Sequence, residues 1–298
     1  MRALGAAGLC LTLLALAGCG SSRSLFSYDR SQPLDLRDRG VVNKPYPIAI
    51  HDVSYLSPKG GRVTGYLVVP PGKGPFPAVL YLHGTGGNRV EWVAPATWMA
   101  ARGAVSLTVD DPFARNPSLR IGTGLAGIRR LHDLYVQEVE DLRRAVDLLQ
   151  SLRYVDAKRI AFVGFSGGAR MGAILAGNEP RIRAFDLISG GGLPAKAFVD
   201  AAPPDKRRDV ARAFEGLDNL TEIRRAHADF LFQDGRRDDV VPHAQLVALA
   251  AAAPKPKELR WYPTGHQPGK QALRDQLDWL AHELGLGGPV VRGAITGP

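Results

Sequence analysis

Short runs of apolar residues alternate along this chain with longer segments of helical periodicity. The apolar runs are rich in valine, isoleucine, leucine and phenylalanine, which is typical of strands buried on both faces. These runs predict strands at residues 48–55, 62–69, 78–82, 105–109, 159–163, 185–188, 230–232 and 259–262. Amphipathic or small-residue periodicity predicts helices at residues 128–152, 169–176 and 271–284.

The alternation of strands and helices predicts an α/β fold. Its mostly parallel, twisted sheet should carry helices on both faces, because parallel strands need crossover helices. Pro58-Lys59-Gly60-Gly61 lies between the first two predicted strands and is a turn sequence. We therefore expect an N-terminal antiparallel hairpin at one edge of the sheet.

The chain of 298 residues suits one α/β domain, which we place at residues 47–284. A polar, proline-punctuated lead-in precedes it, and residues 285–298 read as a loose C-terminal tail. Residues 193–228 form an extra polar, helix-like insertion, a candidate small lid. Asn219, with Glu222 three residues later, predicts a helix cap within it.

The first residues have the pattern of an export signal. Met1-Arg2 is followed by an apolar run over 4–17, shorter than the ~20 residues that span a bilayer. Leu16-Ala17-Gly18-Cys19 resembles the bacterial lipobox, in which the cysteine is lipidated. We expect residues 1–18 to be a signal peptide and residues 19–46 a tether and lead-in. Cys19 would anchor the protein in the cell envelope, with the outer membrane favoured; a plain secretory signal is the alternative.

Composition argues against several other classes of protein. The formal charge is +9, but the basic residues are scattered in short clusters without interleaved aromatics, so we expect no nucleic-acid partner. Both cysteines lie in the first twenty residues, which leaves no thiolate metal site or disulfide framework in the domain. Residues 122–127 spell G-x-G-x-x-G but follow a polar loop, not a strand. We expect no cofactor and no metal.

Gly164-Phe165-Ser166-Gly167-Gly168 is the most informative motif. It is a G-x-S-x-G pentapeptide between a predicted strand and a predicted helix, the context of a nucleophile elbow. Such a turn is strained and exposes the serine hydroxyl, and glycines relieve the close approach of strand and helix. An ordinary glycine-serine turn is the alternative, and motifs elsewhere in the sequence are needed to distinguish the two interpretations.

Together with motifs elsewhere in the sequence, this pentapeptide makes the chain resemble the α/β-hydrolase superfamily, in its dienelactone-hydrolase-like and esterase-like branch. The resemblance covers roughly residues 48–284 and rests on motifs that follow successive strands. These are residues 83–87 (HGTGG), the serine elbow, residues 235–242 (GRRDDVVP) and Gly265-His266. Their order matches the superfamily order of nucleophile, acid and histidine.

The resemblance implies a role for each motif. Ser166 would be the nucleophile, His266 the general base and acid, and Asp238 the carboxylate that orients the histidine. The backbone N–H groups of Thr85 and Gly167 would form the oxyanion hole.

Several neighbouring residues have competing interpretations. Asp239 could replace Asp238, although the spacing to the following Val-Pro favours Asp238. His83 reads as a loop-shaping residue, because its motif supplies backbone donors. Trp92 would line the acyl pocket or be structural. Asp110 and Asp111 end a predicted strand, where they would touch substrate or cap a turn.

These observations predict a serine hydrolase that cleaves a small-molecule carboxylic ester through an acyl-enzyme. A serine peptidase of the prolyl-oligopeptidase-like branch shares the motif order and is the first alternative. A non-catalytic envelope binding protein on a hydrolase fold is the second.

Overall fold

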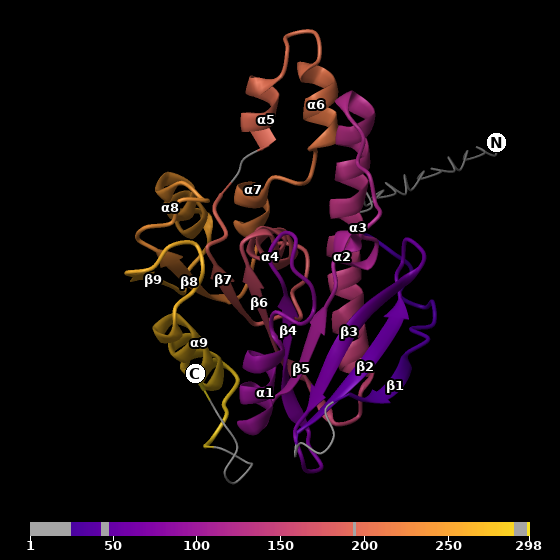
Figure 1. Ribbon diagram of the computed structural model, residues 1–298, viewed down its shortest axis with the longest axis vertical. Helices are drawn as coiled ribbons and strands as arrows, with labels where there is room; N and C mark the ends of the chain where they lie inside the picture. The colour runs from indigo at the N-terminus through magenta and orange to yellow at the C-terminus, as the bar shows by residue number, and fades with distance from the viewer. Residues whose placement is uncertain (1–24, 43–47, 193–194, 289–296) are drawn as a thin grey trace, which may run out of the picture.

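The computed structural model describes residues 25–42, 48–192, 195–288 and 297–298 (Figure 1). The predicted signal peptide and Cys19 lie outside the described residues, as does most of the predicted C-terminal tail. No helix among the described residues combines the length and the apolar character needed to cross a membrane.

Within the described residues the strands form one nine-stranded sheet, in the order β1-β2-β3-β5-β4-β6-β7-β8-β9. The strands are β1 (Arg37–Val41), β2 (Ala49–Leu56), β3 (Arg62–Val69), β4 (Phe76–Leu82), β5 (Val105–Val109), β6 (Val155–Phe165), β7 (Ala184–Ile188), β8 (Asp229–Gly235) and β9 (Lys257–Tyr262). Strands β5, β4, β6, β7, β8 and β9 pair in parallel, while β1, β2 and β3 pair antiparallel at one edge. The predicted α/β class and N-terminal hairpin are both confirmed.

One strand was missed by the sequence pattern. β1 lies in the segment interpreted as a lead-in, and three of its five residues are exposed. A polar edge strand buries too little surface to produce an apolar run or a clear alternation. Its pairing with β2, from Arg37 opposite Ser54 to Val41 opposite His51, is what defines it.

The helices are α1 (Val93–Ala101), α2 (Pro112–Arg115), α3 (Gly124–Ser151), α4 (Gly167–Ala176), α5 (Ala195–Ala201), α6 (Arg207–Ala213), α7 (Asn219–Ile223), α8 (His243–Ala252) and α9 (Lys270–Glu283). α3 begins four residues before its predicted start, inside the G-x-G-x-x-G run. α1 was not predicted, because most of its residues are buried and it therefore lacks a polar stripe.

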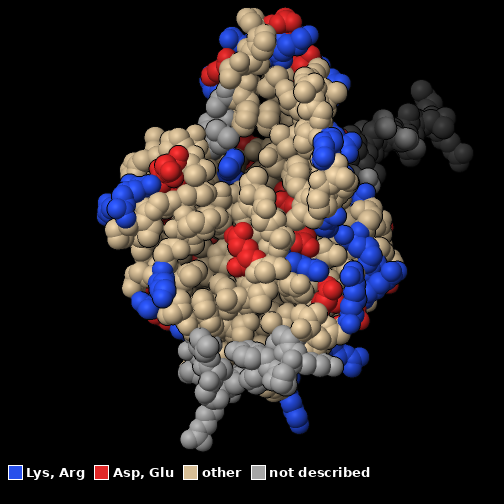
Figure 2. All heavy atoms as spheres, in the orientation of Figure 1, with Lys and Arg blue, Asp and Glu red and all other residues tan. Residues whose placement is uncertain are grey.

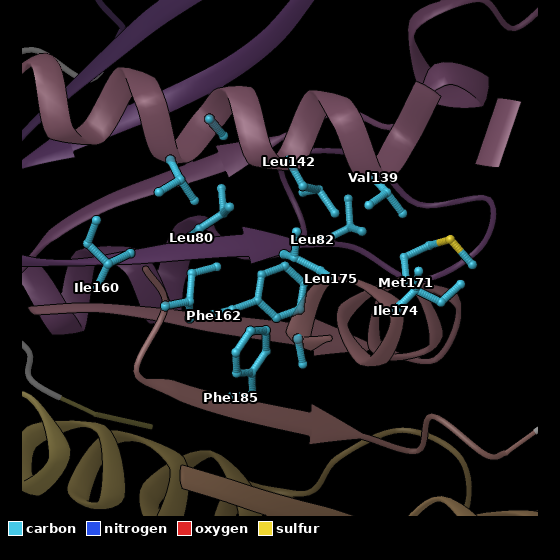
Figure 3. Close-up of a cluster of buried hydrophobic side chains, with 14 of the residues drawn as sticks. Leu80, Leu82, Val139, Leu142, Ile160, Phe162, Met171, Ile174, Leu175 and Phe185 are labelled. Atoms are coloured by element: carbon cyan, nitrogen blue, oxygen red, sulfur yellow. The ribbon is translucent and has the colours of Figure 1, made fainter. Parts of the chain in front are cut away.

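The core consists of two apolar layers, one on each face of the sheet. In β4, Leu80 and Leu82 belong to the layer beneath α3 and α4, while Val79 and Tyr81 belong to the layer beneath α1 and α9. This alternation follows from the two-residue period of a strand. Figure 3 shows Leu175 of α4 beside Phe162 of β6, and Leu142 of α3 beside Leu82 of β4.

The insertion at 193–228 contains α5, α6 and α7. α5 and α6 project beyond the carboxyl ends of the parallel strands, and α6 packs against α3 (Figure 1). The predicted cap at Asn219 is wrong by one residue. Asp218 is the N-cap of α7, and its side chain accepts the N–H groups of Leu220 and Thr221.

The charges on the face shown in Figure 2 are dispersed. Lys and Arg side chains occur as separate groups around the rim and at the tip formed by α5 and α6, with acidic groups between them. This pattern agrees with the interpretation of the basic clusters as solvated surface.

Candidate active site

The topology brings the four predicted motifs to one edge of the sheet. The segments that follow β4, β6, β8 and β9 all leave the carboxyl ends of neighbouring parallel strands. This edge is where open α/β sheets form their sites, because loops from adjacent strands meet there. Residues separated by a hundred positions in sequence therefore come within hydrogen-bond distance.

Ser166 occupies a strained turn between β6 and α4. Its φ of 52° and ψ of −111° lie where a residue with a side chain is uncommon. A Cβ added at Gly164 would lie 2.5 Å from the Gly168 carbonyl oxygen, and one added at Gly168 would lie 2.6 Å from the His83 carbonyl oxygen. The pentapeptide therefore needs glycine at both positions, as a nucleophile elbow requires.

Ser166, His266 and Asp238 form a continuous hydrogen-bonded chain. The Ser166 Oγ lies 2.9 Å from His266 Nε2, and His266 Nδ1 lies 2.9 Å from Asp238 Oδ2. Both ring nitrogens of the histidine are thus engaged, one by a hydroxyl and the other by a carboxylate. This arrangement can take a proton from the serine and stabilise the resulting imidazolium.

The backbone of its own loop holds the Asp238 carboxylate. Its second oxygen accepts the N–H groups of Val240 and Val241, each at 2.9 Å. The Asp238 side chain is only 1% exposed, whereas Asp239 is an exposed residue. Of the two aspartates left open by the sequence, Asp238 is the one that faces the histidine.

His266 has additional contacts that the sequence pattern did not indicate. The Ser189 hydroxyl, after β7, donates to the His266 carbonyl oxygen at 2.9 Å. The ring of Phe165, next to the serine, lies 5.0 Å from the imidazole centroid. Neither Ser189 nor Phe165 could be recognised from a sequence motif, because other residues with a hydroxyl group or an aromatic ring could make the same contacts with His266.

Thr85 and Gly167 also meet, as predicted for the oxyanion hole. A Cβ added at Gly167 would contact Thr85 Oγ1 and lie 3.2 Å from the Thr85 backbone nitrogen. Gly167 is the first residue of α4, so its N–H is one of those that the helix leaves without an internal partner. Backbone N–H groups that point at a reacting oxygen can stabilise the negative charge that develops on it, so the oxyanion-hole role of these two residues stays a prediction.

The other candidates have structural partners. His83 is buried, its Nδ1 lies 2.8 Å from the Gly84 carbonyl oxygen, and its Nε2 accepts the Asp111 N–H. Trp92 is buried and donates to the Leu82 carbonyl oxygen. Asp110 accepts from Thr64 and from the Arg89 N–H, and Asp111 caps α2. These contacts favour the loop-shaping and capping interpretations.

Two buried carboxyl groups, those of Asp234 and Glu138, have raised pKa values. Burial raises the pKa of Asp234, at the end of β8, to about 7, although the Ser189 N–H partly offsets this. Burial also raises the pKa of Glu138 on α3 well above its usual value, and the charge of nearby Asp111 raises it further. Among the described residues no group of three His, Cys, Asp or Glu side chains is arranged to hold a metal ion.

A cavity of about 350 Å³ opens beside Thr85 and Gly167. Much of its lining comes from α3, α4 and the α5–α7 insertion, at positions that no sequence motif marked. Asp111 also lines it, so this aspartate combines a capping role with a place in the wall.

Fold and site together define an α/β-hydrolase of the esterase type. The acetyl xylan esterase (AXE1) family model matches residues 35–188, which is more than half of the chain. The chain therefore belongs to the acetyl xylan esterase family.

Curated relatives are also esterases. Esterase FrsA of Enterobacter sp. (strain 638) is 30% identical over 166 residues, which cover 51% of this chain and 36% of the relative. Esterase FrsA of Salmonella typhi is 29% identical over 283 residues, which cover 86% and 64%. The chain thus spans about a third to two thirds of the length of these curated relatives.

Solved structures share the fold. An acetyl xylan esterase from Paenibacillus sp. R4 superposes with a TM-score of 0.74 at 24% identity, covering 87% of this chain and 90% of that one. Acetyl xylan esterase 1 from Thermoanaerobacterium sp. JW/SL YS485 gives a TM-score of 0.75 at 19% identity, with 87% and 91% covered. The α/β-hydrolase fold predicted from the motifs is confirmed, as is the esterase class.

Proposed function

We propose that the protein hydrolyses a carboxylic ester through an acyl-enzyme formed on Ser166. The observation that carries the proposal is the pair of 2.9 Å contacts that join the Ser166 hydroxyl, both nitrogens of His266 and the Asp238 carboxylate. Membership of an esterase family supports an ester over a peptide bond as the substrate. A complete and hydrogen-bonded triad argues against a purely binding role.

In the first half of the reaction, His266 Nε2 takes the proton of the Ser166 hydroxyl while the Oγ attacks the ester carbonyl. The carbonyl oxygen gains negative charge, which the N–H groups of Thr85 and Gly167 would stabilise. His266 then gives the proton to the departing alcohol oxygen, and the acyl-enzyme remains.

Water replaces the alcohol in the second half. His266 removes a proton from this water as it attacks the acyl carbonyl, and the proton then returns to Ser166 as the acid leaves. Asp238 keeps the Nδ1 proton in place through both halves, so Nε2 is free to accept a proton each time.

The serine is tested with a fluorophosphonate probe, which forms a covalent bond only with an activated nucleophile. We expect labelling of the folded protein and hydrolysis of p-nitrophenyl acetate, with both lost in Ser166→Ala. Ser118→Ala, an exposed serine away from the triad, is the matched control and should behave as wild type. Equal labelling of Ser166→Ala would contradict the proposal.

We further propose that the esterase is exported and held in the cell envelope by lipid on Cys19. The support comes from the sequence alone, namely the apolar run at 4–17 and the lipobox-like residues that follow it. Stable membrane anchoring takes more than one acyl chain, which a lipidated N-terminal cysteine can carry.

Replacing this cysteine is expected to release the protein from the membrane. After expression in a bacterial host, wild type should pellet with membranes and Cys19→Ser should become soluble. Cys10→Ser, within the segment expected to be removed, is the control and should still pellet. Unchanged membrane fractionation of Cys19→Ser would rule out the anchor.

A further inference from the structure

The cavity beside the oxyanion residues has a defined position relative to the catalytic groups. Its wall includes Thr85, Gly167 and Gly168. Among the described residues that line it, Ser166, His266 and Asp238 are all absent, whereas Gly167, which follows the serine, is present. The cavity is therefore bordered by the two oxyanion residues and not by the imidazole.

This position decides which half of an ester the cavity would hold. His266 must protonate the leaving oxygen, so the alcohol part of the ester has to lie on the histidine side. The carbonyl oxygen lies between Thr85 and Gly167. The remaining substituent of the carbonyl carbon, the acyl chain, is then directed into the cavity.

The walls of the cavity are mainly apolar. The apolar side chains from α2, α3, α4 and the segment before α7 are Phe113, Leu131, Met171, Ile174, Phe214 and Leu217, and α3 adds the ring of Tyr135. Phe198 of α5 stacks on Phe214 with ring centroids 4.3 Å apart, and both rings line the cavity on the side of the projecting helices. Apolar walls favour an acyl group that buries methylene or aromatic carbon, at a gain for each carbon removed from water.

The size of the cavity exceeds what an acetyl group needs. Its 350 Å³ lies at the lower end of the range for ligand pockets, ~300–1,000 Å³. An acetyl group contributes only one methyl beyond the carbonyl and would leave most of this apolar surface uncovered.

Charged groups in the wall do not point to an anionic acyl group. Asp111 and Glu138 both line the cavity, and burial favours the neutral form of Glu138. Arg170, four residues after the serine on α4, also reaches the wall. A long arginine side chain can cover apolar surface with its methylenes while its head stays in water.

We infer that this site accepts an uncharged apolar acyl group larger than acetyl, held between α3, α4 and the projecting helices α5 and α6. The inference rests on the proposed esterase function and names the acyl half of its substrate. The family name refers to an acetyl group, whereas the larger acyl group inferred here is argued from the size and lining of this chain's own cavity.

The test is the dependence of kcat/KM on acyl length, measured with p-nitrophenyl acetate, butanoate and hexanoate. Burying one methylene contributes about fourfold, so butanoate should exceed acetate by about tenfold or more. A p-nitrophenyl ester of a dicarboxylic acid of the same length should be a poorer substrate than the neutral ester. A steady fall from acetate to hexanoate, or a preference for the carboxylate-bearing ester, would overturn the inference.

A bulky substitution in the wall links this profile to the cavity. Leu131→Trp on α3 should lower kcat/KM for hexanoate more than for acetate and so remove the advantage of the longer chain. Leu134→Trp, on the same helix but outside the lining, is the matched control and should keep the wild-type profile. Leu131→Phe provides a milder change if the tryptophan variant does not fold. An unchanged profile in folded Leu131 variants would place the acyl chain elsewhere.

These results separate this inference from the proposed function. If no ester is hydrolysed and the fluorophosphonate does not label Ser166, the esterase proposal fails. If acetate is hydrolysed in a Ser166-dependent way but longer chains are not preferred, only the inference about the acyl group fails.

Discussion

Asp238→Asn is expected to lower kcat for p-nitrophenyl acetate by about 10⁴-fold, with little change in stability. An asparagine keeps the size of the side chain but can present an N–H to His266 Nδ1, which selects the wrong tautomer. Nε2 would then carry the proton and could not accept one from Ser166. The variant also loses the negative charge that stabilises the imidazolium formed during the reaction, because the Asp238 carboxylate lies 2.9 Å from His266 Nδ1.

Asp239→Asn is the matched control for this change. The two aspartates are adjacent, but Asp239 is exposed and Asp238 is the one whose oxygens bond His266 and the N–H groups of Val240 and Val241. We expect Asp239→Asn to retain activity within about twofold. Substitution of an exposed residue usually changes the free energy of unfolding by no more than about 0.5 kcal/mol, so the fold should also be retained. Comparable losses in both variants, measured at the same pH, would mean that the acid has been assigned wrongly.

Phe162→Ala is expected to reduce the free energy of unfolding by about 3–5 kcal/mol. Phe162 is fully buried in β6, its ring lies 5.6 Å from the Phe185 centroid, and it contacts the backbone of α4 at Gly172 (Figure 3). Removing the ring leaves a cavity between the sheet and the helix that follows Ser166. Urea denaturation followed by circular dichroism measures the change.

Phe198→Ala is the comparison for the core variant. It makes the same chemical change at a side chain that is 38% exposed and packs mainly on Phe214. We expect a loss of about 1 kcal/mol, which corresponds to one aromatic pair. Similar losses for the two variants would mean that the layer beneath α3 and α4 contributes less than its burial indicates.

The family model covers part of the catalytic machinery, whereas the proposed acyl cavity concerns which ester is accepted. The family model ends at residue 188, so it covers the elbow and the oxyanion loop but neither Asp238 nor the insertion that carries Phe198 and Phe214. Shared chemistry is therefore expected from the matched part. The proposed acyl cavity combines both parts, because Leu131 and Met171 lie inside the matched range whereas Phe198, Phe214 and Leu217 lie beyond it.

Sequence alone determined the fold class and the catalytic residues to be tested. Parallel strands buried on both faces leave apolar runs, and an elbow demands glycines at fixed places around Ser166, so both leave a readable pattern. In the sequence, the choice of Asp238 over Asp239 rested only on the spacing to the following Val-Pro. The fold supports it with a physical reason, since only one of the two carboxylates faces His266.

Other features have no sequence signature and were decided by the tertiary structure. β1 is polar and is defined only by its pairing with β2, and α1 is hidden because it is buried nearly all round. Ser189 and Phe165 act on His266 through contacts that a motif does not specify. The acyl cavity depends most on tertiary structure. Its walls come from helices far apart in the chain, and most of their side chains are ordinary apolar residues. Only their packing around one volume beside Thr85 and Gly167 gives them a shared role.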